Sequence, residues 1–276
     1  MEFGKLFIVA TPIGNLEDIT FRAVSTLKSV DVVAAEDTRH SQKLLQHYDI
    51  STPMMSLHDH NEKQRASYLV EKLKAGTSIA LISDAGTPLI SDPGYHLVNL
   101  CRQESIEVIP IPGASAVITA MCASGLATDQ FSFRGFLPVK QVAKKQALEA
   151  LMDEPATCIF YESPRRVEDT LQVILALFPE RQIVIAKELT KQYEQFVSGT
   201  AQDGLDWLAA DPAHSKGEFV LLIAGADLSE QEIPSDAIAL LKLLAEEVPL
   251  KKAAAIVAKH YGLKKNALYQ IGLEMK

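Results

Sequence analysis

Cysteine is scarce in this chain of 276 residues, which contains only Cys101, Cys122 and Cys158. The three are far apart, odd in number and surrounded by apolar residues, unlike the spacing of disulfide frameworks or zinc sites. We therefore expect buried free thiols in a reducing compartment. Long apolar runs are also missing, since none approaches the roughly 20 residues that cross a bilayer, and the first residues lack a signal-peptide pattern. These absences predict a cytoplasmic protein with no membrane partner.

Two glycine-rich loops that bind nucleotides are missing as well. The sequence contains no Gly-x-Gly-x-Gly loop between a strand-like and a helix-like segment, and no Gly-x-x-x-x-Gly-Lys-Ser/Thr loop. An ordinary Rossmann cofactor site and a P-loop kinase are therefore unsupported. The segment His58-Asp59-His60 resembles metal-ligand spacing, but no partner cluster accompanies it. We interpret it as a polar loop before a helix that starts at Glu62.

Positive charge is deficient overall but concentrated near one end. The formal net charge is −8. After residue 250, six lysines face one glutamate, so this stretch carries +5 and residues 1–250 carry −13. A basic tail on an acidic body suggests a local contact with a polyanion. From the residues alone, a solubilising helix face is the alternative.

Apolar residues make up 47% of the chain and alternate between strand-like runs and helical spacing. Strands are predicted over 6–10, 32–35, 79–82, 106–109, 131–134, 157–161, 182–187, 195–198 and 218–223. Helices are predicted over 20–28, 38–47, 62–75, 94–103, 114–123, 140–152 and 164–178. This alternation predicts α/β layers, although it assigns no strand order.

A polar break at residues 228–234 precedes a purely helical region. Helices are predicted there over 236–247, 250–260 and 264–273. The last two flank Tyr261-Gly262-Leu263, a spacing that resembles a helix-turn-helix unit. A helical cap packed on the preceding domain is the alternative.

The most informative stretch is IALISDAGTPLISDPG, residues 79–94. Its apolar start and its Ser, Asp and Gly residues are typical of a buried strand that ends in a loop. Ligands of open α/β sheets bind just outside such strand ends. Asp84 and Asp92 would serve there as acceptors, and Gly86 would let the backbone approach a ligand closely. Two Asx turns punctuated by proline, with no ligand, are the alternative.

Several other segments occur in a definite order along the chain. They are LFIVATPIGNLEDITFRA (6–23), VAAEDTR (33–39), VIPIPGASA (108–116), FRGFLP (133–138), FYESPRR (160–166), AKELTKQYE (186–194) and GEFVLLIAG (217–225). Together with residues 79–94, they resemble the tetrapyrrole methylase superfamily, and most of all its branch that methylates small-subunit ribosomal RNA. The resemblance covers nearly the whole chain, and it is specific because of the number and order of the motifs.

The resemblance implies two α/β domains, residues 1–113 and 114–228, with a cofactor cleft between them and a helical appendage at residues 229–276. It implies S-adenosylmethionine-dependent methylation of the 2′-oxygen of a cytidine ribose in 16S rRNA, either free or in the small ribosomal subunit, by a homodimer. A tetrapyrrole (precorrin-type) methyltransferase is one alternative, and a non-catalytic RNA-binding protein on the same scaffold is another. The lysine-rich appendage favours a macromolecular substrate over a tetrapyrrole.

The resemblance implies a reaction that needs no metal, so we predict none. It also implies roles for particular residues. Cofactor binding is expected from Ile13, Gly14, Asp84, Gly86, Thr87, Ser115, Ala116, Tyr161 and Leu189. Because a hydroxyl is a poor nucleophile, the enzyme would need a group that orients it or accepts its proton. Candidates for this role are Lys187, Glu188 and Lys191, which follow a strand toward the expected cleft. Glu36, Asp37 and Arg39 form a second polar set, and a simple ion-pair network is the alternative for either set.

Contacts with RNA are expected from basic residues that could pair with phosphates. They are Arg134, Lys140, Arg165, Arg166, Lys251, Lys252, Lys264 and Lys265. Phe136 lies among the first of these and would stack on a splayed base. A core phenylalanine with solvated lysines is the alternative.

Overall fold

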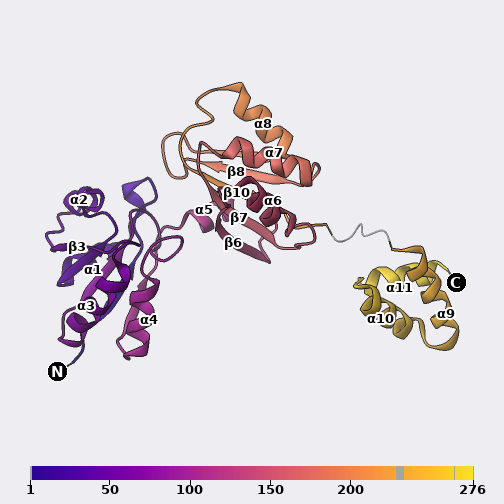
Figure 1. Ribbon diagram of the computed structural model, residues 1–276, viewed down its shortest axis with the longest axis horizontal. Coiled ribbons are helices and arrows are strands. Elements are labelled where there is room, and N and C mark those ends of the chain that lie inside the picture. The colour runs from indigo at the N-terminus through magenta and orange to yellow at the C-terminus, as the bar shows by residue number, and fades with distance from the viewer. Residues whose placement is uncertain (1, 228–232, 264, 276) are drawn as a thin grey trace. The chain divides into compact units, whose positions relative to one another are not determined.

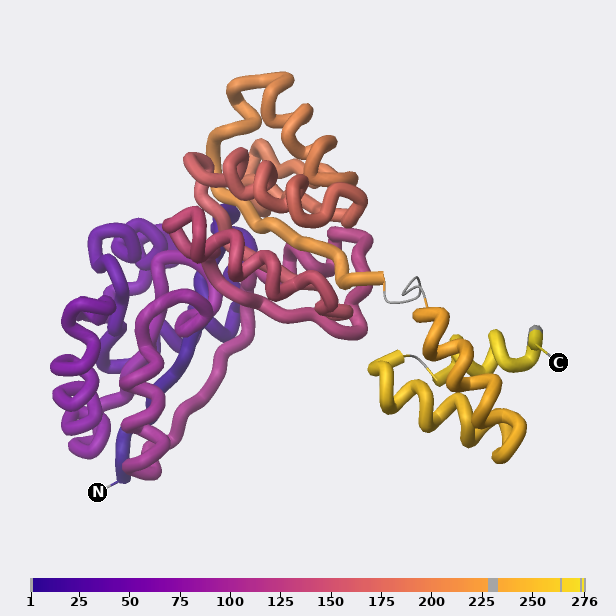
Figure 2. Tube along the Cα trace, turned by 45° about the vertical axis from the view of Figure 1, so that its right-hand side comes forward, coloured from indigo at the N-terminus to yellow at the C-terminus, as the bar shows by residue number. Residues whose placement is uncertain are grey.

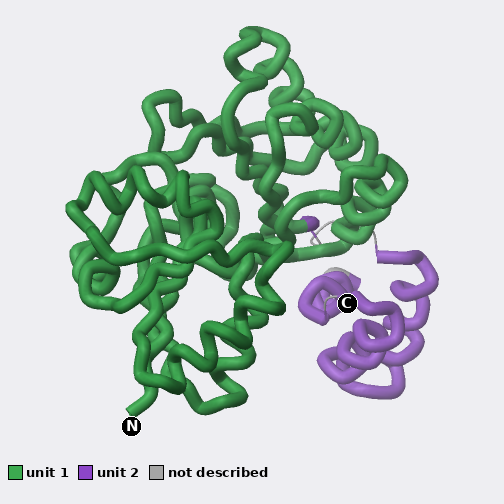
Figure 3. The backbone as a smooth tube through the Cα atoms, turned by 60° about the vertical axis from the view of Figure 1, so that its left-hand side comes forward, with its two compact units in different colours: residues 1–225 green, residues 226–276 purple. Residues whose placement is uncertain are grey.

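The computed structural model describes residues 2–227, 233–263 and 265–275. The chain forms two compact units, residues 1–225 and residues 226–276, which Figure 3 shows in different colours. The first unit contains two five-stranded sheets with helices, so the predicted α/β fold is confirmed. The predicted domain boundaries at residues 113 and 228 stay a prediction.

The first sheet is parallel and has the strand order β3-β2-β4-β1-β5. Its strands are β1 (Leu6–Val9), β2 (Val32–Ala35), β3 (Met54–Ser56), β4 (Ile79–Ile82) and β5 (Val108–Ile111). All four residues of β4 are buried, as expected for a central parallel strand with a continuous apolar sequence. β1 and β4 are neighbours although β2 and β3 lie between them in the sequence. Their carboxyl ends therefore meet where the strand order changes direction, which is where open α/β sheets bind ligands.

Helices cover both faces of the first sheet. They are α1 (Phe21–Ser29), α2 (Thr38–His47), α3 (Glu62–Lys74) and α4 (Tyr95–Gln103), and a short 3₁₀ helix η1 (Leu16–Asp18) precedes them (Figure 1). Leu27 of α1 and Leu45 of α2 belong to the core on one face, and Leu69 of α3 and Leu97 of α4 to the core on the other. Asp37 caps α2 by accepting a 2.8 Å hydrogen bond from the Arg39 amide.

The second sheet is mixed and has the order β6-β7-β10-β8-β9. Its strands are β6 (Phe131–Phe136), β7 (Thr157–Glu162), β8 (Ile183–Lys187), β9 (Gln195–Gly199) and β10 (Phe219–Ile223). β6 and β7 pair in parallel, and the other neighbours pair in antiparallel. Figure 2 follows the chain by colour from the first sheet, through α5 (Ala116–Ala123), into the second.

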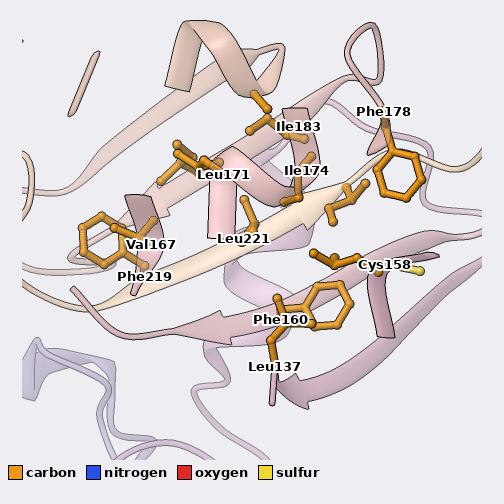
Figure 4. Packing of buried hydrophobic residues seen from close by; sticks show 14 of the residues in the cluster. Leu137, Cys158, Phe160, Val167, Leu171, Ile174, Phe178, Ile183, Phe219 and Leu221 are labelled. Atoms are coloured by element: carbon orange, nitrogen blue, oxygen red, sulfur yellow. The ribbon is translucent and has the colours of Figure 1, made fainter. Parts of the chain in front are cut away.

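The two faces of the second sheet pack against different partners. On one face lie α6 (Gln141–Glu149), α7 (Val167–Leu177) and α8 (Ala201–Ala210), with the apolar core of Figure 4 between helices and strands. On the other face, Val117 and Met121 of α5 pack against Val184 and Leu222 of the strands, and Ile13 from the loop after β1 joins the same core. The loop after β1 therefore contributes to the same apolar core as α5 and this face of the second sheet.

The second unit is a helical bundle of α9 (Ser235–Glu247), α10 (Leu250–Tyr261) and α11 (Lys265–Glu274). Leu241, Val257 and Leu268 are fully buried in its core, one from each helix. α10 ends at Tyr261, and the next residue, Gly262, has a φ of 69°, the left-handed conformation that terminates many helices.

The structure differs from the sequence-based expectations in several places. β5 begins and ends two residues later than the predicted strand 106–109. Neither β3 nor α8 was predicted. Cys101 and Cys158 are buried as expected, but Cys122 is exposed on the last turn of α5, so that expectation was wrong for Cys122. Among the described residues, no helix is long and apolar enough to span a membrane.

Candidate active site

The loops after β1 and β4 are tied together at the carboxyl edge of the first sheet. Thr11 and Gly86 exchange two backbone hydrogen bonds of 2.9 and 3.0 Å, and the Thr11 hydroxyl donates to the Ser83 carbonyl at 3.2 Å. Gly86 has a φ of 80°, and an added Cβ would lie 3.3 Å from Ile13 Cγ2. A residue with a side chain would be strained there, so the glycine lets the two loops meet.

Left-handed backbone at residues other than glycine is concentrated in two turns. Of the six such residues in the described chain, Leu89 and Ser91 follow β4, with φ of 73° and 68°, and Glu188 and Thr190 follow β8, with φ of 51° and 64°. Each costs roughly 1–3 kcal/mol and persists only where the surrounding structure enforces it. Such strain is typical of functional sites, and both turns contribute residues to the same cavity.

A cavity of about 460 Å³ lies between these turns, within the size range of small-molecule sites. Residues from both sheets line it. Eight of the nine residues predicted to bind a cofactor are on its wall: Ile13, Asp84, Gly86, Thr87, Ser115, Ala116, Tyr161 and Leu189. The ninth, Gly14, lies instead against Lys191, whose Cγ would be 2.5 Å from an added Cβ. That these residues bind a cofactor stays a prediction.

The N-terminus of α5 reaches the cavity through Ser115 and Ala116. Ser115 is the N-cap residue, but its side chain makes no capping hydrogen bond to the helix. The Thr87 hydroxyl donates to the Ala114 carbonyl at 3.0 Å and so connects this end of the helix to the loop after β4. Because the first amides of a helix have no partner within it and carry partial positive charge, this part of the wall favours a carboxylate.

The cavity wall is acidic where β2 and β4 end. Glu36, Asp84 and Asp92 line the cavity, and Asp84 Oδ1 accepts a 3.0 Å hydrogen bond from the Asp37 amide. Burial, together with the negative charges of Asp92 and Asp84, raises the pKa of Glu36 to about 7. Burial also raises the pKa of Asp92 to about 6, against the effect of a hydrogen bond from Ser83. We refer to Glu36, Asp84 and Asp92 as the acidic wall.

The residues predicted to handle the substrate proton form a separate polar cluster. Lys191 Nζ lies 2.9 Å from Glu188 Oε1 and 2.9 Å from Glu218 Oε2, and Lys187 is buried. Burial alone would raise the pKa of Glu188, but hydrogen bonds from Lys191 and from the Glu218 amide hold it below its usual value. None of Lys187, Glu188 and Lys191 lines the cavity, although they hold the turn that carries Leu189 into it. A role for them in proton transfer stays a prediction.

The residues predicted to contact RNA differ in their surroundings. Arg134 pairs with Glu154 at 2.6 Å, and Arg166 pairs with the buried Glu162 at 3.3 Å. The other described members of the set are exposed: Lys140, Arg165, Lys251, Lys252 and Lys265. Lys264 lies outside the described residues. Phe136 is 55% exposed and lines the cavity.

Part of the cavity wall was not predicted from the sequence. The additional residues around the ends of β7 and β10 are Glu162, Ser163, Pro164, Glu218, Phe219 and Val220. Glu162 and Phe219 are directly paired in the antiparallel ladder, so the carboxyl end of β7 and the amino end of β10 reach the cavity together. The position of FYESPRR at the end of a strand was the available signal, but its use required knowledge of how the strands pair.

The histidine segment forms a local turn. His58 Nε2 and Asn61 Nδ2 lie 3.0 Å apart, and the His58 amide donates to Asn61 Oδ1 at 3.0 Å. Glu62, the first residue of α3, accepts hydrogen bonds from the amides of Gly94 and His96 at 2.9 and 2.8 Å, and so anchors the end of the loop that carries Asp92. That this protein uses no metal stays a prediction.

Comparison with known proteins identifies the family to which the chain belongs. Residues 5–204 match the family model of tetrapyrrole (corrin/porphyrin) methylases, and residues 231–276 match the RsmI C-terminal HTH domain. A solved uroporphyrin-III C-methyltransferase from Thermus thermophilus, complexed with S-adenosylhomocysteine, has the same fold. It gives a TM-score of 0.56 at 15% identity, over 80% of this chain and 97% of that one. The chain belongs to the tetrapyrrole methylase family.

Within that family, one group of proteins is similar over the whole length. The ribosomal RNA small subunit methyltransferase I of Haemophilus influenzae is 58% identical over 98% of this chain and 96% of its own. The protein of the same name from Escherichia coli O157:H7 is 51% identical over 99% of this chain and 96% of its own. The resemblance inferred from the motifs is confirmed.

Proposed function

We propose that this chain transfers a methyl group from S-adenosylmethionine to RNA of the small ribosomal subunit, at the 2′-oxygen of a cytidine ribose in 16S rRNA. The observation that carries the proposal is the 58% identity to the Haemophilus influenzae protein, which extends over nearly the full length of both chains. The match of residues 231–276 to the RsmI C-terminal domain favours an RNA substrate over a tetrapyrrole.

The cavity has features that suit this cofactor. Its volume of about 460 Å³ can hold most of a cofactor of this size, and its wall combines apolar side chains such as Ile13 and Leu189 with polar groups. The amides at Ser115 and Ala116 would bind the carboxylate of the methionine portion. S-adenosylmethionine supplies a methyl group already activated as a sulfonium. The protein's task is then to exclude water and to hold the acceptor oxygen in line with the methyl group.

The second unit provides a basic face of the kind that contacts phosphates. Leu250, Ala253 and Val257 of α10 are buried in the bundle, while Lys251 and Lys252 are exposed on the outer side of the same helix. Lys265, at the start of α11, is exposed as well. These lysines supply positive charge that the acidic remainder of the chain lacks.

Assembly as a homodimer in the cytoplasm belongs to the same proposal and is supported by the family resemblance. Light scattering on the purified protein, expected to give twice the mass of 30.2 kDa, measures the assembly directly. A mass of one chain across the micromolar range would contradict it.

A methyl-transfer assay tests the proposed function. The purified protein would be incubated with radiolabelled S-adenosylmethionine and, in parallel, with small ribosomal subunits, naked 16S rRNA or a precorrin-type tetrapyrrole. Label is expected in RNA, from subunits or naked rRNA, and in a 2′-O-methylated cytidine after digestion to nucleosides. Label in the tetrapyrrole alone would support the other enzyme class, and absence of both label and cofactor binding would indicate a non-catalytic RNA-binding protein.

Replacing Lys251, Lys252 and Lys265 with glutamate is expected to weaken binding to rRNA fragments while leaving cofactor affinity unchanged. Each lost phosphate contact should flatten the slope of log affinity against log salt by roughly 0.7–0.9, using slopes known for DNA. Fluorescence anisotropy titrations at several salt concentrations provide the measurement.

A variant with Lys28, Lys43 and Lys63 reversed is the matched control, since these exposed lysines of the first unit change the net charge by the same amount. If both triple variants lose affinity equally, the effect comes from net charge alone. If the second-unit variant keeps wild-type affinity and salt slope, this face does not bind RNA.

A further inference from the structure

The acidic wall differs from the other carboxylates of the cavity because no basic side chain neutralises it. Glu162 is paired with Arg166, and Glu218 is paired with Lys191. In the part of the chain that the structure describes, Glu36, Asp84 and Asp92 have no lysine, arginine or histidine nitrogen within 4.0 Å. Among the described lining residues there is likewise no lysine, arginine or histidine. Tyr161 also lines the cavity, but burial raises the pKa of its hydroxyl to about 12, so at neutral pH the side chains that can accept a proton there are the carboxylates.

We propose that Glu36 is the residue that takes the proton from the ribose hydroxyl of the substrate during methyl transfer. This inference rests on the proposed function. In the step, the ribose oxygen forms a bond to the methyl carbon while the bond from that carbon to the sulfonium sulfur breaks. The bonding electron pair stays on sulfur, which becomes a neutral thioether, and the hydroxyl proton moves to a carboxylate oxygen of Glu36. No oxidant, reductant or further reactant is needed.

Geometry favours Glu36 over the other two acids. Asp84 has one carboxylate oxygen engaged by the Asp37 amide, a contact that joins the ends of β2 and β4 and gives Asp84 a positioning role. Asp92 lies well beyond the end of β4, in the loop that contains the left-handed residues Leu89 and Ser91. Glu36 has the longer side chain and follows β2 directly, so it extends into the cavity from a rigid strand end. Bases held on rigid elements keep the alignment that proton transfer needs.

The electrostatic surroundings of Glu36 suit a base that works near neutral pH. Burial and the negative charges of Asp92, Asp84 and Asp59 raise the pKa of Glu36. A hydrogen bond from the Asp84 amide lowers it. With a pKa of about 7, Glu36 is a stronger base than an ordinary carboxylate and is still partly ionised at pH 7. This combination of basicity and ionisation is what general-base catalysis requires.

The lysine cluster is less suited to this task. Burial would lower the pKa of Lys191, but its hydrogen bonds to Glu188 and Glu218 hold that pKa above the usual value. Lys191 therefore keeps its proton and cannot accept another. Lys191 also does not line the cavity, although Leu189, two residues earlier in the sequence, does.

The test compares Glu36→Gln with the wild type in single-turnover methylation of small ribosomal subunits at saturating S-adenosylmethionine. The amide keeps the shape of the side chain and removes its basicity, so the rate is expected to fall by roughly 100-fold or more. Affinity for S-adenosylhomocysteine, measured by calorimetry, is expected to stay within about threefold of wild type. Glu71→Gln, at an exposed position on α3, is the control and should react like wild type.

A pH profile separates a base from a residue that only shapes the site. The wild-type rate should fall as pH decreases below about 7, because Glu36 becomes protonated. Asp92→Asn removes a negative charge that raises the pKa of Glu36, so its profile should shift to lower pH even if its maximal rate is reduced. A structural role would not produce this shift.

The outcomes distinguish this inference from the proposed function. A wild-type protein that methylates no RNA would contradict the proposed function itself. A wild-type protein that is active, together with a Glu36→Gln variant that reacts at the same rate, would overturn only the role of Glu36. Loss of S-adenosylhomocysteine affinity in parallel with the rate would also overturn it, because Glu36 would then bind the cofactor instead. An unchanged pH profile in the Asp92→Asn variant would likewise overturn the role of Glu36 as the base.

Discussion

Ser115→Arg is expected to weaken cofactor binding by roughly 100-fold, equivalent to about 2.7 kcal/mol. Ser115 lies on the cavity wall at the N-terminus of α5, and its side chain makes no capping bond there. An arginine at this position would fill the space in which we place the methionine carboxylate. Because the side chain faces an open cavity, the fold should tolerate it. Calorimetry with S-adenosylmethionine and S-adenosylhomocysteine measures the effect.

The matched control is Ala123→Arg, which places the same side chain on the exposed last turn of the same helix. Its cofactor affinity should equal that of wild type, and both variants should retain the wild-type circular dichroism spectrum. Wild-type affinity in a folded Ser115→Arg variant would mean that the cofactor binds elsewhere.

Arg166→Ala is expected to lower the free energy of unfolding by about 2–3 kcal/mol, because it leaves a buried carboxylate without its counter-charge. Glu162 is 3% exposed, and its Oε1 lies 3.3 Å from Arg166 Nε. The same guanidinium donates to the carbonyls of Leu137 and Pro138 at 2.5 and 3.1 Å, so it also fixes the segment after β6. Denaturant unfolding, followed by fluorescence, provides the measurement.

Arg165→Ala is the natural comparison, since Arg165 is the exposed neighbour of Arg166. It should change stability by no more than about 0.5 kcal/mol. The sequence predicted both arginines to bind RNA, and only Arg165 is free enough of internal contacts to be replaced without loss of stability. If Arg166→Ala keeps full stability and loses RNA affinity, its main role is RNA contact after all.

Much of the fold could be predicted because burial leaves a strong pattern in the sequence. β4 is an example, since all four of its residues are buried and all are apolar. β3, by contrast, has only three half-buried residues, which give too short a signal. α8 contains Gly204, which normally disfavours a helix. The structure explains this glycine, because an added Cβ would lie 2.9 Å from Ile185 Cδ1 of β8.

The candidate site was predictable where strand ends in a parallel sheet bring residues together, as they do for Asp84 and Glu36. It was less predictable in the mixed sheet. Ala186, Val220 and Tyr161 lie side by side in that sheet and pack with α5 in the shared core. Lys187 is one residue further along β8, so its side chain alternates to the opposite face. Periodicity alone could not show which face of the sheet Lys187 lies on.

The most direct test of the central claim is mass mapping of 16S rRNA from an Escherichia coli strain that lacks its own ribosomal RNA small subunit methyltransferase I. The RNA would be compared with and without a plasmid that encodes this chain. The expected result is that one nuclease fragment gains the mass of a single methyl group, located on the ribose of a cytidine, and that Glu36→Gln fails to restore it. Identical fragment masses with and without the expressed, soluble wild-type chain would contradict the account.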